Sequence, residues 1–207
     1  TQAGGLLVST PTLTVGTTTG SVGSLLTPLR TNASTVTANS SSGGNIFIND
    51  IQTGDVALVG ANGTAGTFNF TANNGAGFNI YTPGLTDFVF GGTANIRSLN
   101  GGVGNLLLGN RQLNTSNLDN LVVNAAENVN VFGQTALNFG GGTSSAGANG
   151  LFAALGAANI TSTSAISGRD VVIANLDASG GTIALGATVT ATGANGVAAI
   201  VSSGNLN

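Results

Sequence analysis

Residues 44–80 constrain the fold more than any other stretch of the chain. Short runs within this stretch place apolar side chains next to polar ones, the pattern of strands with one buried face. These runs are IFI at 46–48, VAL at 56–58, FNF at 68–70 and FNI at 78–80. Glycine and asparagine, which tolerate positive φ at tight corners, separate them. The stretch therefore predicts short strands joined by tight corners, about every ten to twelve residues.

The same pattern continues along the chain as an imperfect internal repeat of about 20 residues. One set of strand centres in this alignment is Ile46, Phe68, Phe88, Leu108 and Val129. A second set, about ten residues later in each cycle, is Val56, Phe78, Ile96, Leu118 and Leu137. A repeat of this length signals a solenoid, and strand-like alternation makes it a parallel β-helix. We therefore predict an all-β chain whose coils stack at about 4.8 Å per step.

We expect a single β-solenoid domain over residues 1–207. Residues 1–44 form N-terminal coils or a cap, 45–139 the regular coils and 160–207 the C-terminal coils. Residues 140–159 interrupt the rhythm. The run GGGTSSAGANG predicts a loop, and LFAALGAAN after it is either a short helix packed on the solenoid or an apolar flap.

Charge is scarce, and this excludes several functions. Charged residues make up 5% of the chain and hydrophobic residues 41%, so a core can form and a disordered polar chain is excluded. Stacked coils would bring like charges together, which accounts for the low charge content. The four arginines form no basic patch, which argues against a nucleic-acid partner. No apolar run is long enough to span a bilayer.

The candidate catalytic and metal-binding residues are few and scattered. The chain has seven carboxylates and one tyrosine but no histidine, lysine or cysteine to act as a base or nucleophile. A glycosidase-type pair of carboxylates is the remaining enzymatic alternative. GGVGNLLLGN at 101–110 resembles a calcium-binding repeat, but Asn105 replaces the acidic ligand. We therefore expect no enzyme activity, no cofactor and no metal.

Two further patterns concern ion pairs and the spacing of threonines. Arg169 with Asp170, and Arg97 with Asp119, are candidate ion pairs, of little energetic value if exposed. Four Thr-x-Thr pairs suggest a flat ice-binding face, but in our alignment they do not recur at the coil period. They are Thr12/Thr14, Thr35/Thr37, Thr161/Thr163 and Thr188/Thr190.

Residues 21–50, SVGSLLTPLRTNASTVTANSSSGGNIFIND, resemble a recurring block in large secreted exoproteins of the filamentous haemagglutinin type. The likeness lies in a Gly-Ser-Val-Gly-like start, a Pro-Leu-x-Thr middle and a Gly-x-Ile-Phe-Ile end. ENVNVFG at 127–133, ISGRDVVIANLDASGGTIAL at 166–185 and NGVAAIVSSGNLN at 195–207 look like ordinary coils of that class. The resemblance implies a right-handed β-helix with an extracellular adhesive or structural role.

Neither end of the sequence shows a charged or helical cap, although a β-helix exposes unpaired strand edges and apolar columns at its ends. End-to-end stacking is a heterologous contact that builds an open filament. We therefore predict a non-enzymatic extracellular structural protein, a fibre subunit or adhesin segment, whose partners are copies of itself, head to tail. The expected contact residues are Leu6, Leu7, Val8, Leu13, Val15, Val197, Ile200, Val201 and Leu206.

The alternative function is a module that binds host or environmental surface glycans. It would act through one face of the solenoid or through the loop at 140–159. Aromatic side chains on an outer face would support it. Most of the nine phenylalanines stand in alternating strand runs, which favours the core for them instead.

Overall fold

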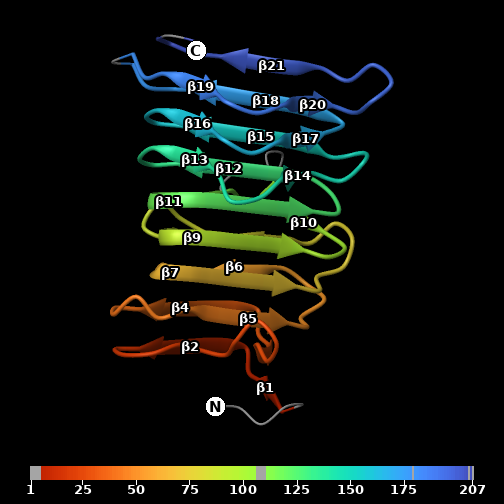
Figure 1. The fold of residues 1–207 in the computed structure, drawn as a ribbon. Helices are drawn as coiled ribbons and strands as arrows, with labels where there is room; N and C mark the ends of the chain where they lie inside the picture. The colour runs from red at the N-terminus through yellow and green to blue at the C-terminus, as the bar shows by residue number, and fades with distance from the viewer. Residues whose placement is uncertain (1–5, 106–110, 179, 205, 207) are drawn as a thin grey trace.

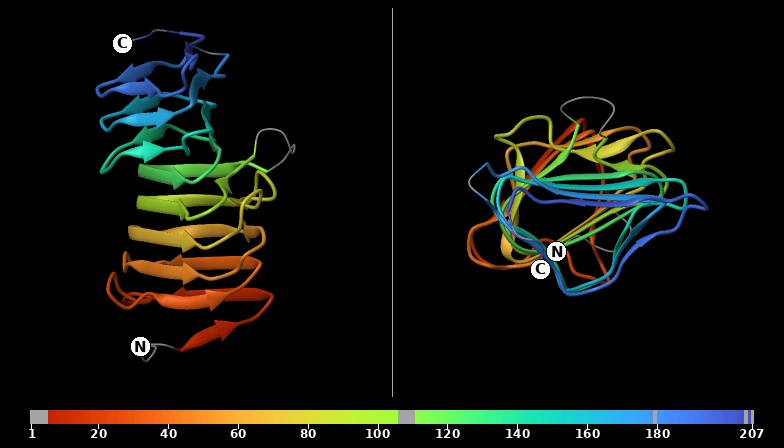
Figure 2. Two further views of the ribbon diagram at one scale, coloured as in Figure 1. Left: turned by 90° about the vertical axis from the view of Figure 1, so that its right-hand side faces the viewer. Right: turned by 90° about the horizontal axis from the view of Figure 1, so that it is seen from above.

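The computed structural model is a β-solenoid of about eight turns, with equivalent strands about 23 residues apart (Figure 1). It describes residues 6–105, 111–178, 180–204 and 206. The strands pair in parallel from coil to coil, and the described residues contain no helix. Side and axial views show the coils stacked along one axis (Figure 2). The parallel β-helix predicted from the alternating runs is confirmed.

The strands are short apart from three that bend round a corner of the coil. In chain order they are β1 (Leu7–Ser9), β2 (Thr12–Thr17), β3 (Leu29–Asn32), β4 (Thr35–Ser40), β5 (Ile46–Asp50), β6 (Val56–Leu58), β7 (Ala61–Ala72), β8 (Asn79–Tyr81), β9 (Phe88–Ser98), β10 (Gly102–Val103), β11 (Leu113–Ala125), β12 (Val129–Gly133), β13 (Leu137–Phe139), β14 (Ser144–Ser145), β15 (Leu151–Gly156), β16 (Ile160–Ser162), β17 (Ile166–Gly168), β18 (Asp170–Asn175), β19 (Ile183–Leu185), β20 (Val189–Ala191) and β21 (Ala198–Val201).

Two ladders of strands run the length of the solenoid. Ladder A stacks β1, β3, β5, β7, β9 and β11, and then continues side by side as β13, β16, β19 and as β14, β17, β20. Ladder B stacks β2, β4, β6, β8, β10, β12, β15, β18 and β21. The long strands β7, β9 and β11 join the ladders, because the first part of β7 pairs with β4 and the first part of β11 with β12.

The core consists of apolar columns that face inward between the ladders. Ladder A contributes Ile48, Phe70, Ile96 and Val123 at one register position of four successive coils. Ladder B contributes Val56, Ile80, Val103, Val129, Phe152 and Val171 in the same way. All ten side chains are buried. Burial of each large one contributes roughly 1.5–3 kcal/mol, so the columns hold the coils together.

The predicted sets of strand centres agree with the observed columns of stacked side chains in the first coils and disagree further along the chain. Ile46 and Phe68 share a column as expected, but Ala94 occupies the next coil in place of Phe88, and Leu121 follows. The second predicted set fails in the same way: Ile80, not Phe78, stacks on Val56. Leu108 lies outside the described residues.

Variable coil length explains the error. Column neighbours lie 22 residues apart at Ile46 and Phe68 but 27 apart at Ala94 and Leu121. The extra residues enter at the corners, which carry no strand periodicity.

No helix forms between residues 140 and 159, so the short-helix alternative is wrong. The loop half contains the two-residue strand β14, and the Ala/Leu-rich half is strand β15. Phe152 and Ala154 point into the core, and β15 pairs with β12 on one side and β18 on the other. These neighbours supply backbone hydrogen-bond partners on both edges of the strand, which outweighs the local preference of Ala and Leu for helix.

Glycine is required where β7 and β9 approach each other closely at a corner. Gly63 in β7 and Gly91 in β9 have φ of 144° and 107°, values that other residues rarely adopt. A Cβ atom at Gly91 would collide with the carbonyl oxygen of Thr64 one coil below, and one at Gly63 with that of Phe90. The close stacking of β7 on β9 therefore depends on these two positions.

Candidate functional site

The N-terminal end of the solenoid exposes strand edges and apolar side chains. Among the described residues, β1 pairs only with β3 and β2 only with β4, so each has one open edge. Leu6, Leu7 and Val8 are between 37% and 60% exposed there. Leu13 and Val15, also predicted as contact residues, pack into the core. Three of these five predicted residues are therefore available at this end.

The C-terminal end is similar. Within the described part of the chain, β20 pairs only with β17 and β21 only with β18. Val197, Val201 and Leu206 are 58–59% exposed, whereas Ile200 packs against the core. Both end coils thus offer unpaired backbone groups next to apolar side chains.

The carboxylates serve mainly as acceptors for backbone N–H groups at corners. Asp50 is fully buried: its Oδ2 accepts from the Thr31 hydroxyl at 2.6 Å and from the Ala33 N–H at 3.2 Å, and its Oδ1 accepts from the Gln52 N–H at 2.7 Å. These bonds tie β5 to the coil beneath it. The sequence indicated turn positions for the acids but did not reveal this role.

Four other acids make similar links between coils. The accepted bonds are Asn79 N–H to Asp55 at 2.8 Å, Gly60 N–H to Asp87 at 2.6 Å, Gly77 N–H to both oxygens of Glu127 at 3.0 Å, and Val197 N–H to Asp170 at 3.0 Å. The Val197 bond, together with the Arg169 guanidinium, lowers the pKa of Asp170 below its usual value. The acids are thereby distributed along the solenoid and engaged with its backbone.

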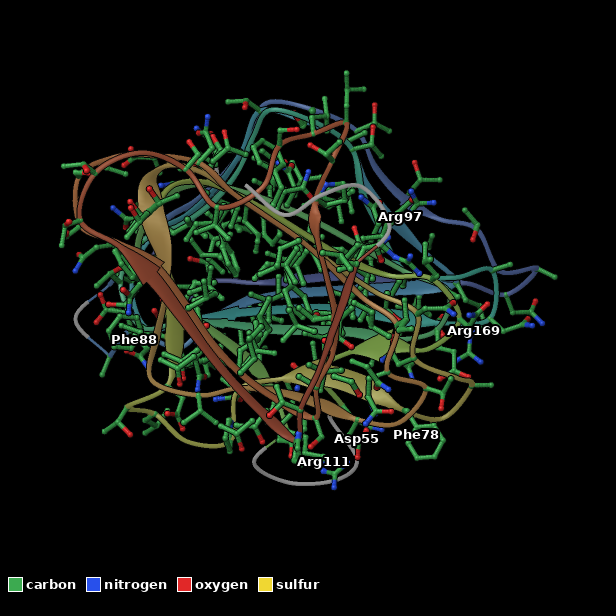
Figure 3. The ribbon with its side chains drawn as sticks, turned by 90° about the horizontal axis from the view of Figure 1, so that it is seen from below. Asp55, Phe78, Phe88, Arg97, Arg111 and Arg169 are labelled. Atoms are coloured by element: carbon green, nitrogen blue, oxygen red, sulfur yellow. The ribbon has the colours of Figure 1, made fainter. Side chains whose placement is uncertain are left out.

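One predicted ion pair forms and another does not. Arg169 and Asp170 approach to 2.6 Å. Arg97 and Asp119 are not paired within the described residues, where the other salt bridge joins Arg111 to Asp55. Figure 3 shows Arg111 and Asp55 side by side at the rim of the solenoid.

The guanidinium carbon of Arg111 also lies 5.0 Å from the centre of the Tyr81 ring, a cation–π contact. The sequence did not indicate this cluster, because 56 residues separate Asp55 from Arg111. Arg111 therefore links two coils beneath it.

No three His, Cys, Asp or Glu side chains of the described chain come close enough to hold a metal ion. In the calcium-like stretch 101–110, residues 102–103 form β10, and residues 106–110 lie outside the described part.

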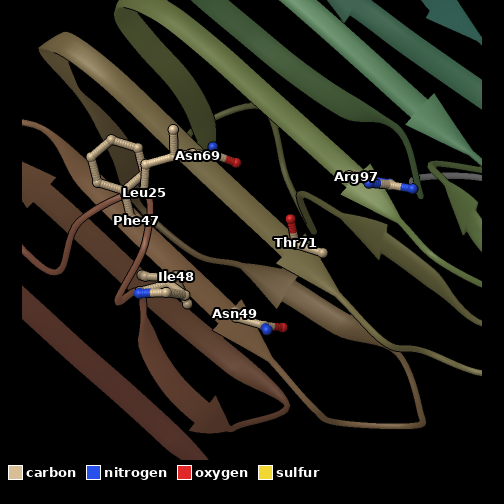
Figure 4. A pocket seen from close by; sticks show the side chains of 8 residues that line it. Leu25, Phe47, Ile48, Asn49, Asn69, Thr71 and Arg97 are labelled. Carbon is tan, nitrogen blue, oxygen red and sulfur yellow. The ribbon is translucent and has the colours of Figure 1, made fainter. Parts of the chain in front are cut away.

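A shallow groove of about 280 Å³ lies on the outer face of ladder A (Figure 4). Strands β5, β7 and β9 form its floor, and the turn that contains Leu25 and Pro28 forms one wall. The side chains that line its floor come from outward-facing strand positions. They are Phe47 and Asn49 on β5, Asn69 and Thr71 on β7, and Arg97 on β9. We call this surface the outer groove.

Fewer than half of the nine phenylalanines belong to the core, although alternation predicted the core for most of them. Phe68, Phe70, Phe139 and Phe152 are fully buried. Phe78 is 45% exposed, and Phe47, Phe88, Phe90 and Phe132 are half-buried. The reason is register: in β5 the isoleucines on either side of Phe47 face inward, which turns Phe47 outward.

The Thr-x-Thr pairs also behave differently from the prediction. Thr12 stacks on Thr35 and Thr14 on Thr37, so two of the four pairs do recur at the coil period. The next coil places Ala57 above Thr35. The threonine array therefore spans two coils and does not extend into a broad face.

Comparison of the chain with family models, with curated proteins and with solved structures finds no match. Across the described residues, no helix has the length and hydropathy needed to cross a membrane. The geometry of the solenoid itself is therefore what bears on function.

Proposed function

We propose that the chain is a non-enzymatic structural β-solenoid outside the cell, a fibre subunit or adhesin segment that extends by stacking copies head to tail. The observation that carries this proposal is the pair of open ends. Each end coil presents strand edges without a partner among the described residues, next to exposed apolar side chains. Open edges are templates for further strand pairing.

The charge distribution favours stacking at these ends. Residues 1–29 and 178–207 contain no Asp, Glu, Lys or Arg, so neither terminal stretch carries the side-chain charges that usually protect an edge strand. The ends differ from each other: β1 and β2 form one, and β20 and β21 the other. The natural contact is therefore heterologous, one lower end on one upper end, and it repeats without closing.

The use of the acids supports a role without catalysis. Five of the seven carboxylates accept backbone N–H groups in the described structure, and they are spread over the length of the solenoid. The extracellular location rests on the resemblance of residues 21–50 to filamentous haemagglutinin-type exoproteins.

Sedimentation velocity and negative-stain microscopy over a concentration series test the proposal. We expect rods that lengthen with concentration. Val201→Lys, which charges the upper edge, and Val8→Lys, which charges the lower edge, should each give monomers. Leu85→Lys is the matched control, because Leu85 is 65% exposed in the turn between β8 and β9, away from both ends. Circular dichroism confirms that each variant keeps its strands.

A mixture of the two end variants tests polarity. Each variant retains one intact end, so head-to-tail stacking predicts dimers in the mixture and monomers of each variant alone. Wild type that is monodisperse at every concentration would refute the proposal. Equal loss of assembly in Leu85→Lys, or dimers of Val201→Lys alone, would also contradict head-to-tail stacking.

A further inference from the structure

The outer groove combines an apolar wall with polar side chains that form no hydrogen bond or ion pair with any described residue. From this combination we propose that the groove binds an anionic polysaccharide laid along the solenoid axis. The inference is independent of end-to-end assembly, because the groove lies on the side of the solenoid.

The apolar part of the groove comes from two directions. Phe47 projects outward from β5, and Leu25, 72% exposed, stands over the groove from the turn before β3 (Figure 4). Pro28 completes this wall. Ligand sites generally combine such apolar surface with a few polar groups that fix orientation. The ring of Phe47 offers a flat surface for the C–H face of a sugar.

The polar part is unengaged. The side chains of Asn49, Asn69 and Thr71 form no hydrogen bond with any described residue. Asparagines at the corners behave differently: Asn45 accepts the Thr67 N–H at 2.8 Å, and others do the same. An amide side chain donates and accepts, and a hydroxyl does both. The groove therefore presents a row of groups that match the hydroxyls of a carbohydrate.

Arg97 decides the charge of the ligand. Its side chain is exposed, lines the groove and forms no ion pair or hydrogen bond with the described residues. By contrast, Arg111 and Arg169 are both paired with aspartates. An unpaired guanidinium binds carboxylate or sulfate through two parallel hydrogen bonds. With a net charge of −3, the chain does not attract polyanions in general, so binding requires a local site such as this one.

The register shows why a polymer fits better than a single sugar. Asn49, Thr71 and Arg97 occupy one column of successive coils, which are separated by about 4.8 Å per step. The column continues with Asn124, Ser145 and Ser167, so polar groups follow the axis beyond the groove. A linear polysaccharide along this column meets a polar group on every coil, and its anionic group meets Arg97.

Calorimetric titration with three probes tests the site. Dextran sulfate supplies sulfate groups, and alginate oligosaccharides supply carboxylates. Unmodified dextran is the uncharged control, because it has the same sugar backbone as dextran sulfate. We expect dextran sulfate, alginate or both to bind and dextran not to bind. Which anionic probe binds more tightly identifies the acidic group. Arg97→Gln should weaken binding about tenfold or more, since a charge-assisted contact is lost. Phe47→Thr should weaken it as well.

Arg169→Gln is the matched control, because it removes the same charge from an exposed arginine elsewhere on the solenoid. It should leave the affinity unchanged. The proposal is overturned if neither anionic probe binds, if dextran binds equally well, or if Arg169→Gln and Arg97→Gln reduce affinity to the same extent. In the last case the binding is a general charge effect.

Discussion

Two buried threonines provide a sharp test of the buried hydrogen bonds, because the hydroxyl groups of the two residues differ in their partners. Thr31 in β3 and Thr115 in β11 are both fully buried. The Thr31 hydroxyl donates to Asp50 at 2.6 Å, whereas the Thr115 hydroxyl has no hydrogen-bond partner among the described residues. Valine has nearly the shape of threonine and lacks the hydroxyl. The same substitution should therefore have opposite effects at the two positions.

The magnitudes follow from the contacts. Thr31→Val removes one of the three donors to the Asp50 carboxylate, and loss of such a bond costs about 1.5–3 kcal/mol. Thr115→Val removes a buried hydroxyl that no described residue satisfies, which should stabilise the fold by roughly 1 kcal/mol or more. In a chain of this size 1 kcal/mol corresponds to about 2–4 °C in Tm. We expect Tm to fall by about 3–12 °C for Thr31→Val and to rise by about 2 °C or more for Thr115→Val.

Thermal denaturation followed by circular dichroism, with urea titration as a second method, measures both variants. Loss of stability in Thr115→Val equal to that in Thr31→Val would refute the reasoning. It would mean that the two hydroxyls are equally satisfied, or that shape alone governs these positions. The double variant should show additive changes, because the two sites share no partner.

Two further predictions concern a corner glycine and an acid near the upper end. Gly91→Ala should destabilise the solenoid by more than about 2 kcal/mol, because φ there is 107° and the new Cβ meets backbone. Gly54→Ala places its Cβ in open space and should change the free energy of unfolding by no more than about 0.5 kcal/mol. Equal melting temperatures of the two variants would contradict this account. The hydrogen bond from the Val197 N–H lowers the pKa of Asp170 in the folded state. The ionised Asp170 therefore stabilises the fold above its usual pKa of 3.8, and this stabilisation disappears as pH falls through the folded-state pKa. The Tm difference between wild type and Asp170→Asn should therefore shrink in acid; a constant difference would argue against it.

The local pattern was enough to predict the class of fold. Alternation in β5 and β7, with glycine and asparagine between the strands, predicted parallel coils and placed Ile46 and Phe68 in one column. This works because strand alternation is a property of neighbouring residues: it specifies which side chains share a face before any coil has met another. Of the nine apolar residues predicted at the two ends, six are exposed, whereas Leu13, Val15 and Ile200 pack into or against the core.

Only the tertiary structure decided which coils and side chains meet. The corners differ in length, so the column that begins at Ile46 continues through Ala94, and no local pattern reveals this. The Ala/Leu-rich residues became β15 because β12 and β18 provide hydrogen-bond partners on both sides. The outer groove has the same origin, since Phe47 and Arg97 are brought together by two turns of the chain. Which residues share a column depends on the length of each coil. That register is settled only when the coils stack on one another.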